Sequence, residues 1–336
     1  MTQDNMGQAG SHKGICIVWH SYGRRGQLIA DKFHLKLHLI HSLKRYYILA
    51  PLRYVLQSLK TLAVLIREKP KLVFVQNPPI FAVAIVYIYA KLWKAQYVID
   101  SHTGALLAPW WKWTLPIHAF LSRRAITTIV TNEHLKAMVE AWGANAFILA
   151  DLPTTFPQGK PFPLNSEFNV TVINTFSPDE PLEEVLAAAA TLPKVQFYVT
   201  GNLIRAKNSL FENQPDNVKF TGFLPDEDYF GLLRATQAVM TLTTDNHTMQ
   251  RAACEAVSLG KPIITSNWPI LKEYFDKGTL YVDNSAKGIR EAVITMQQER
   301  GRLQKEILIL QHERWQEWQH KYATLTELVE GNSKHK

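Results

Sequence analysis

An acid and a histidine two residues apart end one of the apolar stretches of the chain. In AQYVIDSHTG (95–104), Asp100 and His102 follow β-branched and aromatic residues that predict a buried strand. Alternate residues of an extended segment point the same way. A carboxylate there would orient the imidazole and raise its basicity. His102 is therefore a candidate general base, or a hydrogen-bond partner for a substrate hydroxyl.

Two other strand ends in the first half carry residues suited to a ligand. In VWHSYGRRGQLIA (18–30), Gly23 and Gly26 flank Arg24 between a predicted strand and a helix. Glycines let the backbone approach a ligand, and the helix N-terminus favours an anion. A tight turn between strand and helix accounts for them equally well. In VQNPPIFA (75–82), Asn77 ends a strand before two prolines, where we expect it at the ligand edge.

The second half repeats this arrangement with more charge. Gly201 ends the strand of FYVTGNLIRAK (197–207), and Arg205 and Lys207 could reach a diphosphate. The polar loop 243–248 enters a helix that carries Glu255 among small apolar neighbours. A carboxylate in such surroundings needs a partner, such as the two hydroxyls of a ribose. Glu255 as an ordinary surface glutamate is the alternative.

The pattern of apolar residues predicts the elements that position these groups. In the first half we expect strands and helices to alternate, with one long helix over 26–40. The other expected segments are strands at 14–20, 71–76, 96–100, 126–132 and 146–151 and helices at 56–69, 80–93 and 133–143. In the second half we expect strands at 169–176, 195–201, 217–223, 238–244, 261–266 and 279–283, with helices at 179–192, 226–237, 248–260, 270–278 and from 286 onward. Such alternation predicts parallel, doubly wound α/β sheets.

Composition divides the chain into a basic half and a mildly acidic half. The segment 151–167 holds four prolines and is predicted to be a linker. The expected domains are 1–150 and 168–315, followed by a helix and tail over 316–336. Residues 1–150 carry 18 Lys+Arg against 6 Asp+Glu, or +12, which leaves 19 against 23, or −4, for the remainder. Nucleic acid, anionic lipid or a phosphorylated substrate could match the basic half, but no nucleic-acid module is present.

Several classes of site are not indicated. The two cysteines lie far apart, so a disulfide scaffold is excluded, and no zinc spacing, Asp-X-Asp pair or Walker loop occurs. We therefore expect no metal and no cofactor. The N-terminal residues show no apolar export signal, and the run 80–90 is shorter than the roughly 20 residues of a spanning helix.

These segments together resemble a GT-B glycosyltransferase of the family 4 type. The match is strongest over VKFTGFLPDEDYFGLLRATQAVMTLTT and ACEAVSLGKPIITSNWPILKEYF. FVQNPPIFAVAIVY, VIDSHTGALL and NTFSPDEPLEEVLAAA are similar to segments of the chitobiosyldiphosphodolichol β-mannosyltransferase family. The resemblance implies two Rossmann-like domains facing a cleft, with a nucleotide-sugar donor in the C-terminal domain and an acceptor in the N-terminal one.

The resemblance also implies roles for particular residues. His102 would be the catalytic-site histidine, and 23–26 the loop beneath the sugar. Glu255 would bind the ribose, and Thr248, Met249 and Gln250 would lie beside the phosphates. Family 4 enzymes often carry a second glutamate eight positions earlier, where this chain has His247. Their usual Arg and Lys after the first C-domain strand are replaced by NTFSPDE (174–180). Retention or inversion of configuration stays open.

The expected activity is transfer of a hexosyl group from a GDP- or UDP-linked sugar to a lipid-linked glycan. KLHLIHSLKRYYILAPLRYVLQSLK (36–60) and APWWKWTLPIHAFLSRRA (108–125) mix basic and aromatic residues, which favours peripheral contact with the cytoplasmic face of a membrane. Core or acceptor-pocket tryptophans are the alternative. A non-catalytic GT-B subunit and a sugar-nucleotide epimerase are competing interpretations.

Overall fold

The computed structural model describes residues 14–42, 49–164, 166–212 and 214–334. By internal contacts the chain divides into two compact units, which are described separately. Unit 1 comprises residues 1–152 together with 321–336, and unit 2 comprises residues 153–320. The long helix α13 (Arg300–Lys334) therefore contributes to both units. The assignment of acceptor to 1–150 and donor to 168–315, with a helix and tail over 316–336, stays a prediction.

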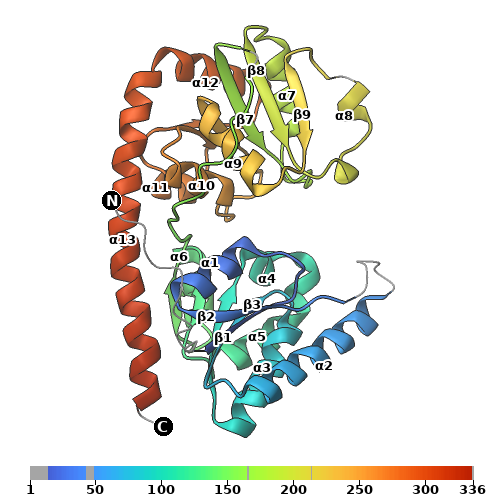
Figure 1. Cartoon of the computed structure of the whole chain (residues 1–336), viewed down its shortest axis with the longest axis vertical. Helices are drawn as coiled ribbons and strands as arrows, with labels where there is room; N and C mark the ends of the chain where they lie inside the picture. Colours follow the sequence, from blue (N-terminus) through green and yellow to red (C-terminus); the bar gives the residue numbers. More distant parts are fainter. Residues whose placement is uncertain (1–13, 43–48, 165, 213, 335–336) are drawn as a thin grey trace. The chain divides into compact units, whose positions relative to one another are not determined.

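Unit 1 is built on a parallel sheet with the strand order β2-β1-β3-β4-β5-β6 (Figure 1). Its strands are β1 (Gly14–Val18), β2 (Leu35–Leu39), β3 (Leu72–Asn77), β4 (Gln96–Ser101), β5 (Thr128–Val130) and β6 (Ala146–Ile148). Its helices are α1 (Arg24–Lys32), α2 (Ala50–Glu68), α3 (Ile80–Trp93), α4 (Thr103–Leu107), α5 (Leu115–Ser122) and α6 (Glu133–Glu140), with the 3₁₀ helix η2 (Pro109–Thr114). The central strands are fully buried, as the apolar runs predicted.

One expected element is wrong. The predicted helix over 26–40 is a short helix, α1, followed by strand β2. His34 adopts a left-handed backbone conformation with φ 52°, which ends the helical path. Beyond it, Leu35, Leu37 and Leu39 alternate with polar residues, which is the period of a strand rather than of a helix.

Unit 2 has a second parallel sheet with the order β12-β11-β10-β7-β8-β9. Its strands are β7 (Phe168–Ile173), β8 (Val195–Thr200), β9 (Val218–Gly222), β10 (Ala238–Thr241), β11 (Ile263–Ser266) and β12 (Thr279–Val282). Its helices are α7 (Leu182–Ala190), α8 (Ser209–Glu212), α9 (Asp226–Ala235), α10 (Arg251–Ser258), α11 (Pro269–Tyr274) and α12 (Ala286–Gln298), with the 3₁₀ helix η3 (Leu203–Arg205).

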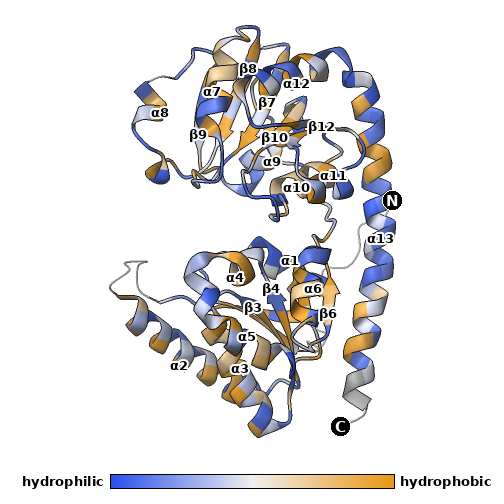
Figure 2. Ribbon diagram, turned by 180° about the vertical axis from the view of Figure 1, so that it is seen from behind, coloured by the Kyte–Doolittle hydropathy of each residue, from blue (hydrophilic) through white to orange (hydrophobic). Residues whose placement is uncertain are grey.

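Apolar strand residues fill both faces of the unit 2 sheet. Val170 and Val172 pack toward α7 and α12, whereas Val239 and Ile263 pack toward α9, α10 and α11. Figure 2 shows the strands coloured hydrophobic and the outer faces of many helices hydrophilic. Doubly wound sheets of this kind bind ligands at the carboxyl ends of the strands, where the strand order reverses. The expected ligand sites are therefore at two sheet edges, one in each unit.

Candidate active site

In unit 1 the strand order reverses beside β1, whose neighbours are β2 and β3. The carboxyl edge at this point carries the loop that leads into α1 and the ends of β3 and β4. Strand pairing places Gln76 opposite Asp100 and Asn77 opposite Ser101. Cross-strand partners point to the same face of a sheet, and consecutive residues point to opposite faces. The edge therefore has two layers, one with Gln76, Asp100 and His102 and one with Asn77 and Ser101.

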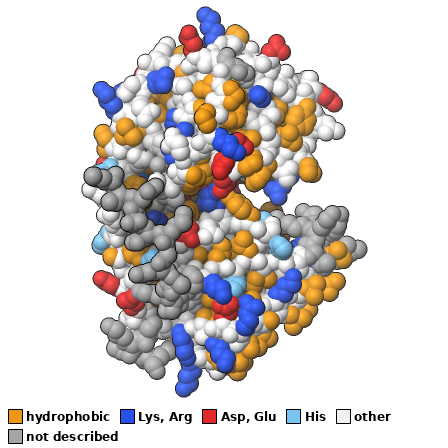
Figure 3. Space-filling view, in the orientation of Figure 1, with side chains coloured by type: hydrophobic (Ala, Val, Ile, Leu, Met, Phe, Trp, Pro, Cys, Tyr) orange, Lys and Arg blue, Asp and Glu red, His pale blue; other side chains and the backbone are white. Residues whose placement is uncertain are grey.

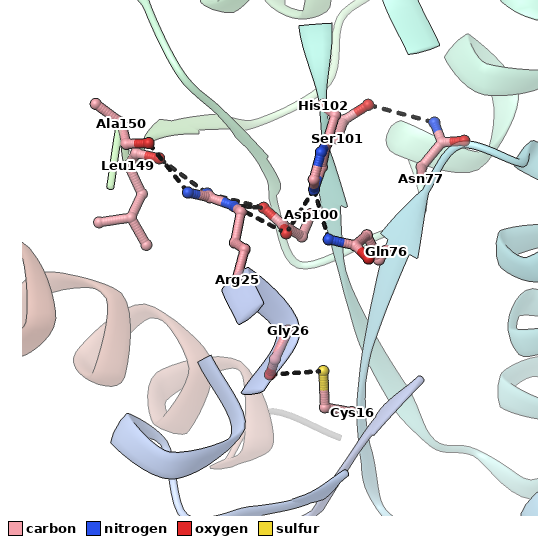
Figure 4. A network of polar contacts seen from close by, with 10 residues as sticks. All are labelled: Cys16, Arg25, Gly26, Gln76, Asn77, Asp100, Ser101, His102, Leu149 and Ala150. Atoms are coloured by element: carbon pink, nitrogen blue, oxygen red, sulfur yellow. Dashed lines mark hydrogen bonds and ion pairs between the residues drawn. The ribbon is translucent and has the colours of Figure 1, made fainter. Parts of the chain in front are cut away.

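Asp100 is held by a buried arginine that the sequence argument passed over. Arg25 donates from Nε to both carboxylate oxygens of Asp100 at 3.0 Å, and from Nη2 to Oδ1 at 2.9 Å (Figure 4). The remaining donors of Arg25 bond the carbonyl oxygens of Leu149 and Ala150. Asp100 is 3% exposed and Arg25 is 7% exposed. The pair is therefore an internal, nearly dry salt bridge.

Burial alone would raise the pKa of Asp100, because it removes water from the charged form. The Arg25 guanidinium and the adjacent His102 oppose this effect, and the net result is a pKa well below the usual range. Asp100 therefore stays a carboxylate. The buried Cys16 lies close by, donates to the carbonyl of Gly26 and has its thiol pKa raised by burial and by Asp100.

His102 lies beside this carboxylate, as predicted from the two-residue spacing. Its Nε2 is 3.5 Å from Asp100 Oδ2 and 2.5 Å from Nε2 of the Gln76 side-chain amide. The side chain is 41% exposed, so the ring is open to a ligand. Its Nδ1 has no hydrogen-bond partner among the described residues. The amide nitrogen of Gln76 can only donate, so a proton held on Nε2 by Asp100 requires the Gln76 amide to be turned with its oxygen toward the ring. The lone pair on Nδ1 is then available as a base.

Asn77 is the last residue of β3, but its side chain lies on the face of the sheet that also carries Ser101, away from His102. Asn77 is 1% exposed. Its Nδ2 lies 3.3 Å from Ser101 Oγ and 3.3 Å from His118 Nε2. Burial lowers the pKa of His118 to about 4, so this imidazole is neutral near pH 7. Asn77 thus ends β3 at the carboxyl edge, but its side chain lies in the buried layer, and Gln76 faces His102. A role of Asn77 in binding a ligand stays a prediction.

The glycine loop has mixed roles. Gly23 is the N-cap of α1, and Arg24, the first helical residue, donates to the hydroxyl of Tyr22 at 2.9 Å. Gly26 lies inside α1, where a Cβ would come 2.5 Å from Val18 Cγ2. Gly26 therefore allows the helix to pack tightly on β1, which is sufficient reason for a glycine there.

In unit 2 the order reverses between β7 and β10, so the loops 174–181 and 242–250 border the candidate site. Thr243 Oγ1 donates to Asp179 Oδ2 at 2.8 Å, and the amide of Thr244 donates to the carbonyl of Asp179 at 2.7 Å. These bonds tie the two loops together. The NTFSPDE segment therefore forms an ordered part of the edge, although it lacks the Arg and Lys expected of the family.

The carboxylate of Glu180 lies inside the loop 174–181 and is bonded to that loop. It accepts hydrogen bonds from the backbone amides of Thr175 at 2.7 Å and Ser177 at 3.0 Å, and from the Thr175 hydroxyl. Burial raises the pKa of Glu180, although these hydrogen bonds partly oppose the shift. The backbone amides of Thr175 and Ser177, which are the kind of donors that bind a phosphate, are thus already satisfied within the chain.

Glu255 is buried, with 4% of the residue exposed. Its Oε2 accepts from the Tyr229 hydroxyl at 2.7 Å, and its Oε1 pairs with Arg251 Nε at 3.2 Å. The buried carboxylate of Glu255 therefore already has partners within the protein. Arg251 Nη2 is buried and has no hydrogen-bond partner among the described residues. Arg251 lies one helical turn before Glu255 on α10, and Tyr229 reaches Glu255 from α9. These two partners could be predicted only with the helical phase of α10 and the packing of α9 against it known.

The other predicted donor residues surround this edge. His247, Thr248, Met249 and Gln250 are partly buried in the loop before α10, with Thr248 bonded to Asp245 and Gln250 to Thr241. Arg205 and Lys207 are exposed near η3, and Lys207 pairs with Glu183 at 3.6 Å.

Gly201 has φ +135°, and a Cβ there would come 2.1 Å from the carbonyl oxygen of Asn174. It therefore lets the ends of β7 and β8 approach each other. Among the described residues no group of three or more His, Cys, Asp or Glu could hold a metal ion.

Comparison with known proteins connects this geometry to a fold. A sequence model of the family described as "Glycosyl transferase-like" matches residues 179–327. The crystal structure of HepE from Anabaena in complex with UDP and glucose aligns with a TM-score of 0.67 at 15% identity and covers 96% of this chain and 98% of that chain. The fold is that of a GT-B glycosyltransferase. Sucrose-phosphate synthase from Thermosynechococcus elongatus shares this GT-B fold, with a TM-score of 0.70, 14% identity and coverage of 90% and 84%.

Among curated proteins, the chitobiosyldiphosphodolichol beta-mannosyltransferase of Pongo abelii is 25% identical to this GT-B chain over 226 residues. That match covers 62% of this chain and 45% of the relative. The chain therefore matches less than half the length of this relative. No helix among the described residues combines the length and apolar character needed to cross a membrane.

Proposed function

We propose that the protein transfers a hexosyl group from a GDP- or UDP-linked sugar to a lipid-linked glycan, without a metal or cofactor. The observation that carries the proposal is His102, open to ligand at the reversal point of a GT-B sheet and backed by the Asp100–Arg25 pair. The match of residues 179–327 to a glycosyl transferase-like family supports a donor site in unit 2. The name of the mannosyltransferase relative supports a lipid-linked acceptor.

In the proposed mechanism, Asp100 accepts the Nε2 proton of His102, and Gln76, turned so that its amide oxygen faces the ring, fixes the imidazole at the same nitrogen. Nδ1 then accepts the proton of the acceptor hydroxyl as that oxygen forms a bond to the sugar C1. The bond from C1 to the donor phosphate oxygen breaks, and the electron pair leaves with the nucleoside diphosphate. If His102 only positions the sugar, its loss would weaken acceptor binding more than it slows turnover.

The donor is proposed to bind at the edge formed by the loops 174–181 and 242–250. Arg251, with its unpaired Nη2, can pair with the leaving diphosphate, aided by the N-terminal amides of α10. Glu255 can accept a ribose hydroxyl in addition to its present partners, because a carboxylate has about four lone-pair sites. Arg205 and Lys207 are exposed and would have to move toward the donor.

The protein is further proposed to act at the cytoplasmic face of a membrane through the basic unit 1. Trp110 is 71% exposed and Trp113 is 63% exposed, and Lys112 lies between them in η2. Exposed tryptophans beside lysines suit a membrane interface. Their exposure argues against tryptophans that serve only the core. Salt-sensitive flotation with anionic vesicles is the expected result, and an absence of binding at low salt would count against this location.

A thermal-shift series with UDP, GDP, ADP and their common sugar conjugates tests donor binding. A ligand at 100 times its dissociation constant stabilises the native state by about 2.7 kcal/mol. We expect stabilisation by one family of nucleotides, greater for the sugar conjugate than for the free nucleoside diphosphate. If none of these nucleotides changes the melting temperature, the transferase proposal fails.

The same series tests the main alternative, a non-catalytic GT-B subunit. One observation favours that alternative: Glu180 and Glu255 already occupy the hydrogen-bonding groups of the donor edge. A subunit of this kind would not be stabilised by any nucleotide. A sugar-nucleotide epimerase would be stabilised, but it would interconvert sugars on the nucleotide without any acceptor.

A further inference from the structure

Helix α2 of unit 1 exposes an apolar stripe on its outward face. Its buried residues are Gln57, Thr61 and Leu65, and two of these three are polar. Its outward face carries Leu52, Val55 and Leu59, which are 51%, 55% and 60% exposed. These three recur at the spacing of one helical face. An ordinary surface helix has the opposite arrangement, so the outer face of α2 is suited to an apolar partner.

A groove lies along this face of α2. It has a volume of about 370 Å³, which is within the range of ligand pockets. Its walls are formed by α2 and the start of α3, with the lining residues Pro51, Tyr54, Val55, Ser58, Leu59 and Phe81. The hydroxyls of Ser58 and Tyr54 are the hydrogen-bonding groups among these side chains. The groove therefore offers contact surface to a hydrocarbon and little to a polar ligand.

Aromatic rings fix the shape of the groove. Trp19 stacks on Tyr54 with centroids 6.3 Å apart, and Tyr54 contacts Phe81 at 5.0 Å. Phe81 in turn contacts Trp111 at 6.4 Å and Trp113 at 6.2 Å. Buried hydrogen bonds hold the base of the groove, because Trp19 Nε1 donates to Thr61 Oγ1 at 2.8 Å. The groove is thus preformed, which lowers the ordering cost of binding.

The groove is connected through the chain to the candidate active site. Phe81 is the second residue of α3, which follows Gln76 and Asn77 at the end of β3. The tryptophans of η2 follow His102 after the short helix α4. A ligand in the groove would therefore contact the segments that leave the catalytic edge.

Basic residues lie beside the groove. The guanidinium of Arg53 is 5.2 Å from the ring centroid of Tyr54, Lys60 follows Leu59 on α2, and Lys112 lies between Trp111 and Trp113 in η2. Figure 3 shows hydrophobic side chains gathered at the lower right of unit 1, over α2 of Figure 1, with Lys and Arg beside them. Apolar surface with a basic border complements a ligand that joins a hydrocarbon to a phosphate.

We infer that this groove binds the hydrocarbon chain of the acceptor, a polyisoprenyl chain that ends in a phosphate. The inference rests on the proposed function for the identity of the acceptor. Binding in the groove would hold the chain while the attached glycan reaches the edge that carries His102. Chain length would then determine the acceptor KM, although the chain takes no part in the chemistry.

Direct binding tests the inference without any turnover. A long-chain polyisoprenyl phosphate and farnesyl phosphate, which share a head group, are titrated in the same detergent while tryptophan fluorescence is recorded. We expect the long chain to bind at least tenfold more tightly than farnesyl phosphate. The double variant Val55→Asn/Leu59→Asn should lose this difference, since both side chains are exposed and their replacement leaves the core intact. Ile309→Asn on α13, at a residue 51% exposed, is the matched control and should keep the difference.

Turnover with short-chain and long-chain acceptors separates this inference from the proposed function. We expect the double variant to raise the KM of the long-chain acceptor at least tenfold and to leave the short-chain KM and kcat unchanged. If neither acceptor is turned over but the long chain still binds in the groove, the proposed function fails and the inferred hydrocarbon site stands. Equal binding of both chains by wild type and variant overturns the inference.

Two other results would also overturn it. A loss of self-association in the double variant would identify a second copy of the chain as the occupant. A loss of flotation on acceptor-free vesicles, with unchanged discrimination between chains, would make the face a membrane contact only.

Discussion

Replacement of Asp100 by Asn is expected to destabilise unit 1 strongly. The carboxylate accepts three hydrogen bonds of 3.0 Å or less from Arg25, and both residues are at least nine-tenths buried. Solvent therefore screens the pair little. Removal of one partner leaves a buried charge without compensation, which costs about 3–5 kcal/mol. Arg25→Met should lose a similar amount, and Arg24→Met, whose side chain is partly exposed, should lose far less.

The combination of the two changes tests the physical cause. The double variant Arg25→Met/Asp100→Asn retains no charge at this position, so its loss should be well below the sum of the single losses. Urea unfolding can be followed by tryptophan fluorescence, because six of the nine tryptophans lie within residues 1–152. If Asp100→Asn loses less than about 1 kcal/mol, or if the two losses simply add, the pair is not the buried charge anchor described above.

Asp100→Asn should also change the pH dependence of the free energy of unfolding. The pKa of Asp100 is lowered in the folded state, so its contribution is complete above the unfolded value of about 3.9. That contribution is lost as the pH falls below this value toward the folded pKa. The wild type should therefore lose stability in this acid range, and Asp100→Asn should lack that part of the loss.

Other predictions concern His118, Lys261 and Gly201. The pKa of His118 is lowered to about 4 by burial, so the wild type should lose stability as the pH falls from about 6.5 to 4, and His118→Gln should lose less in urea titrations at these pH values. Burial lowers the pKa of Lys261 to about 8, so stability should rise between pH 8 and about 10.4, and calorimetry should show this rise absent in Lys261→Met. Gly201→Ala should lower the melting temperature and weaken nucleotide binding, because its Cβ would strike the carbonyl of Asn174. Gly301→Ala, with nothing within 4 Å, should do neither, and a normal Gly201→Ala would contradict the described loop geometry.

Much of the architecture could be predicted from the sequence, because alternating apolar runs are the direct consequence of strands buried on both faces. The failure at β2 has a local cause. A helix and a strand follow one another across His34 without a glycine or proline, so the pattern over 26–40 was interpreted as one helix. Only the change of period at Leu35 marks the boundary; before it, Leu28 and Ile29 lie on the buried face of α1.

The candidate site was predictable where one strand suffices and missed where two elements meet. Asp100 and His102 lie on one strand end, and their proximity follows from its geometry. Gln76 required the register of β3 against β4, which a single sequence does not reveal. The sequence did not distinguish Arg25 from Arg24, because the distinction depends on the phase of α1, in which Arg25 shares the buried face with Leu28 and Ile29.

The donor edge of unit 2 was the least predictable part. Three of its contacts join residues far apart in sequence: Asp179 with Thr243, Tyr229 with Glu255, and Gly201 with Asn174. Contacts of this kind, between loops or between helices, follow from the assembled sheet and have no local pattern. The roles of the residues at this edge in binding a nucleotide sugar stay predictions.

The measurement that tests the central claim most directly is turnover by His102→Ala, compared with donor binding by the same variant. His134→Ala, on the exposed surface of α6, is the matched control. We expect His102→Ala to bind the nucleotide sugar as wild type does and to lose at least a hundredfold in kcat, since general base catalysis contributes about 10²–10⁴. His134→Ala should retain both properties. Full turnover by His102→Ala with intact donor binding would contradict the assignment of His102 to the active site.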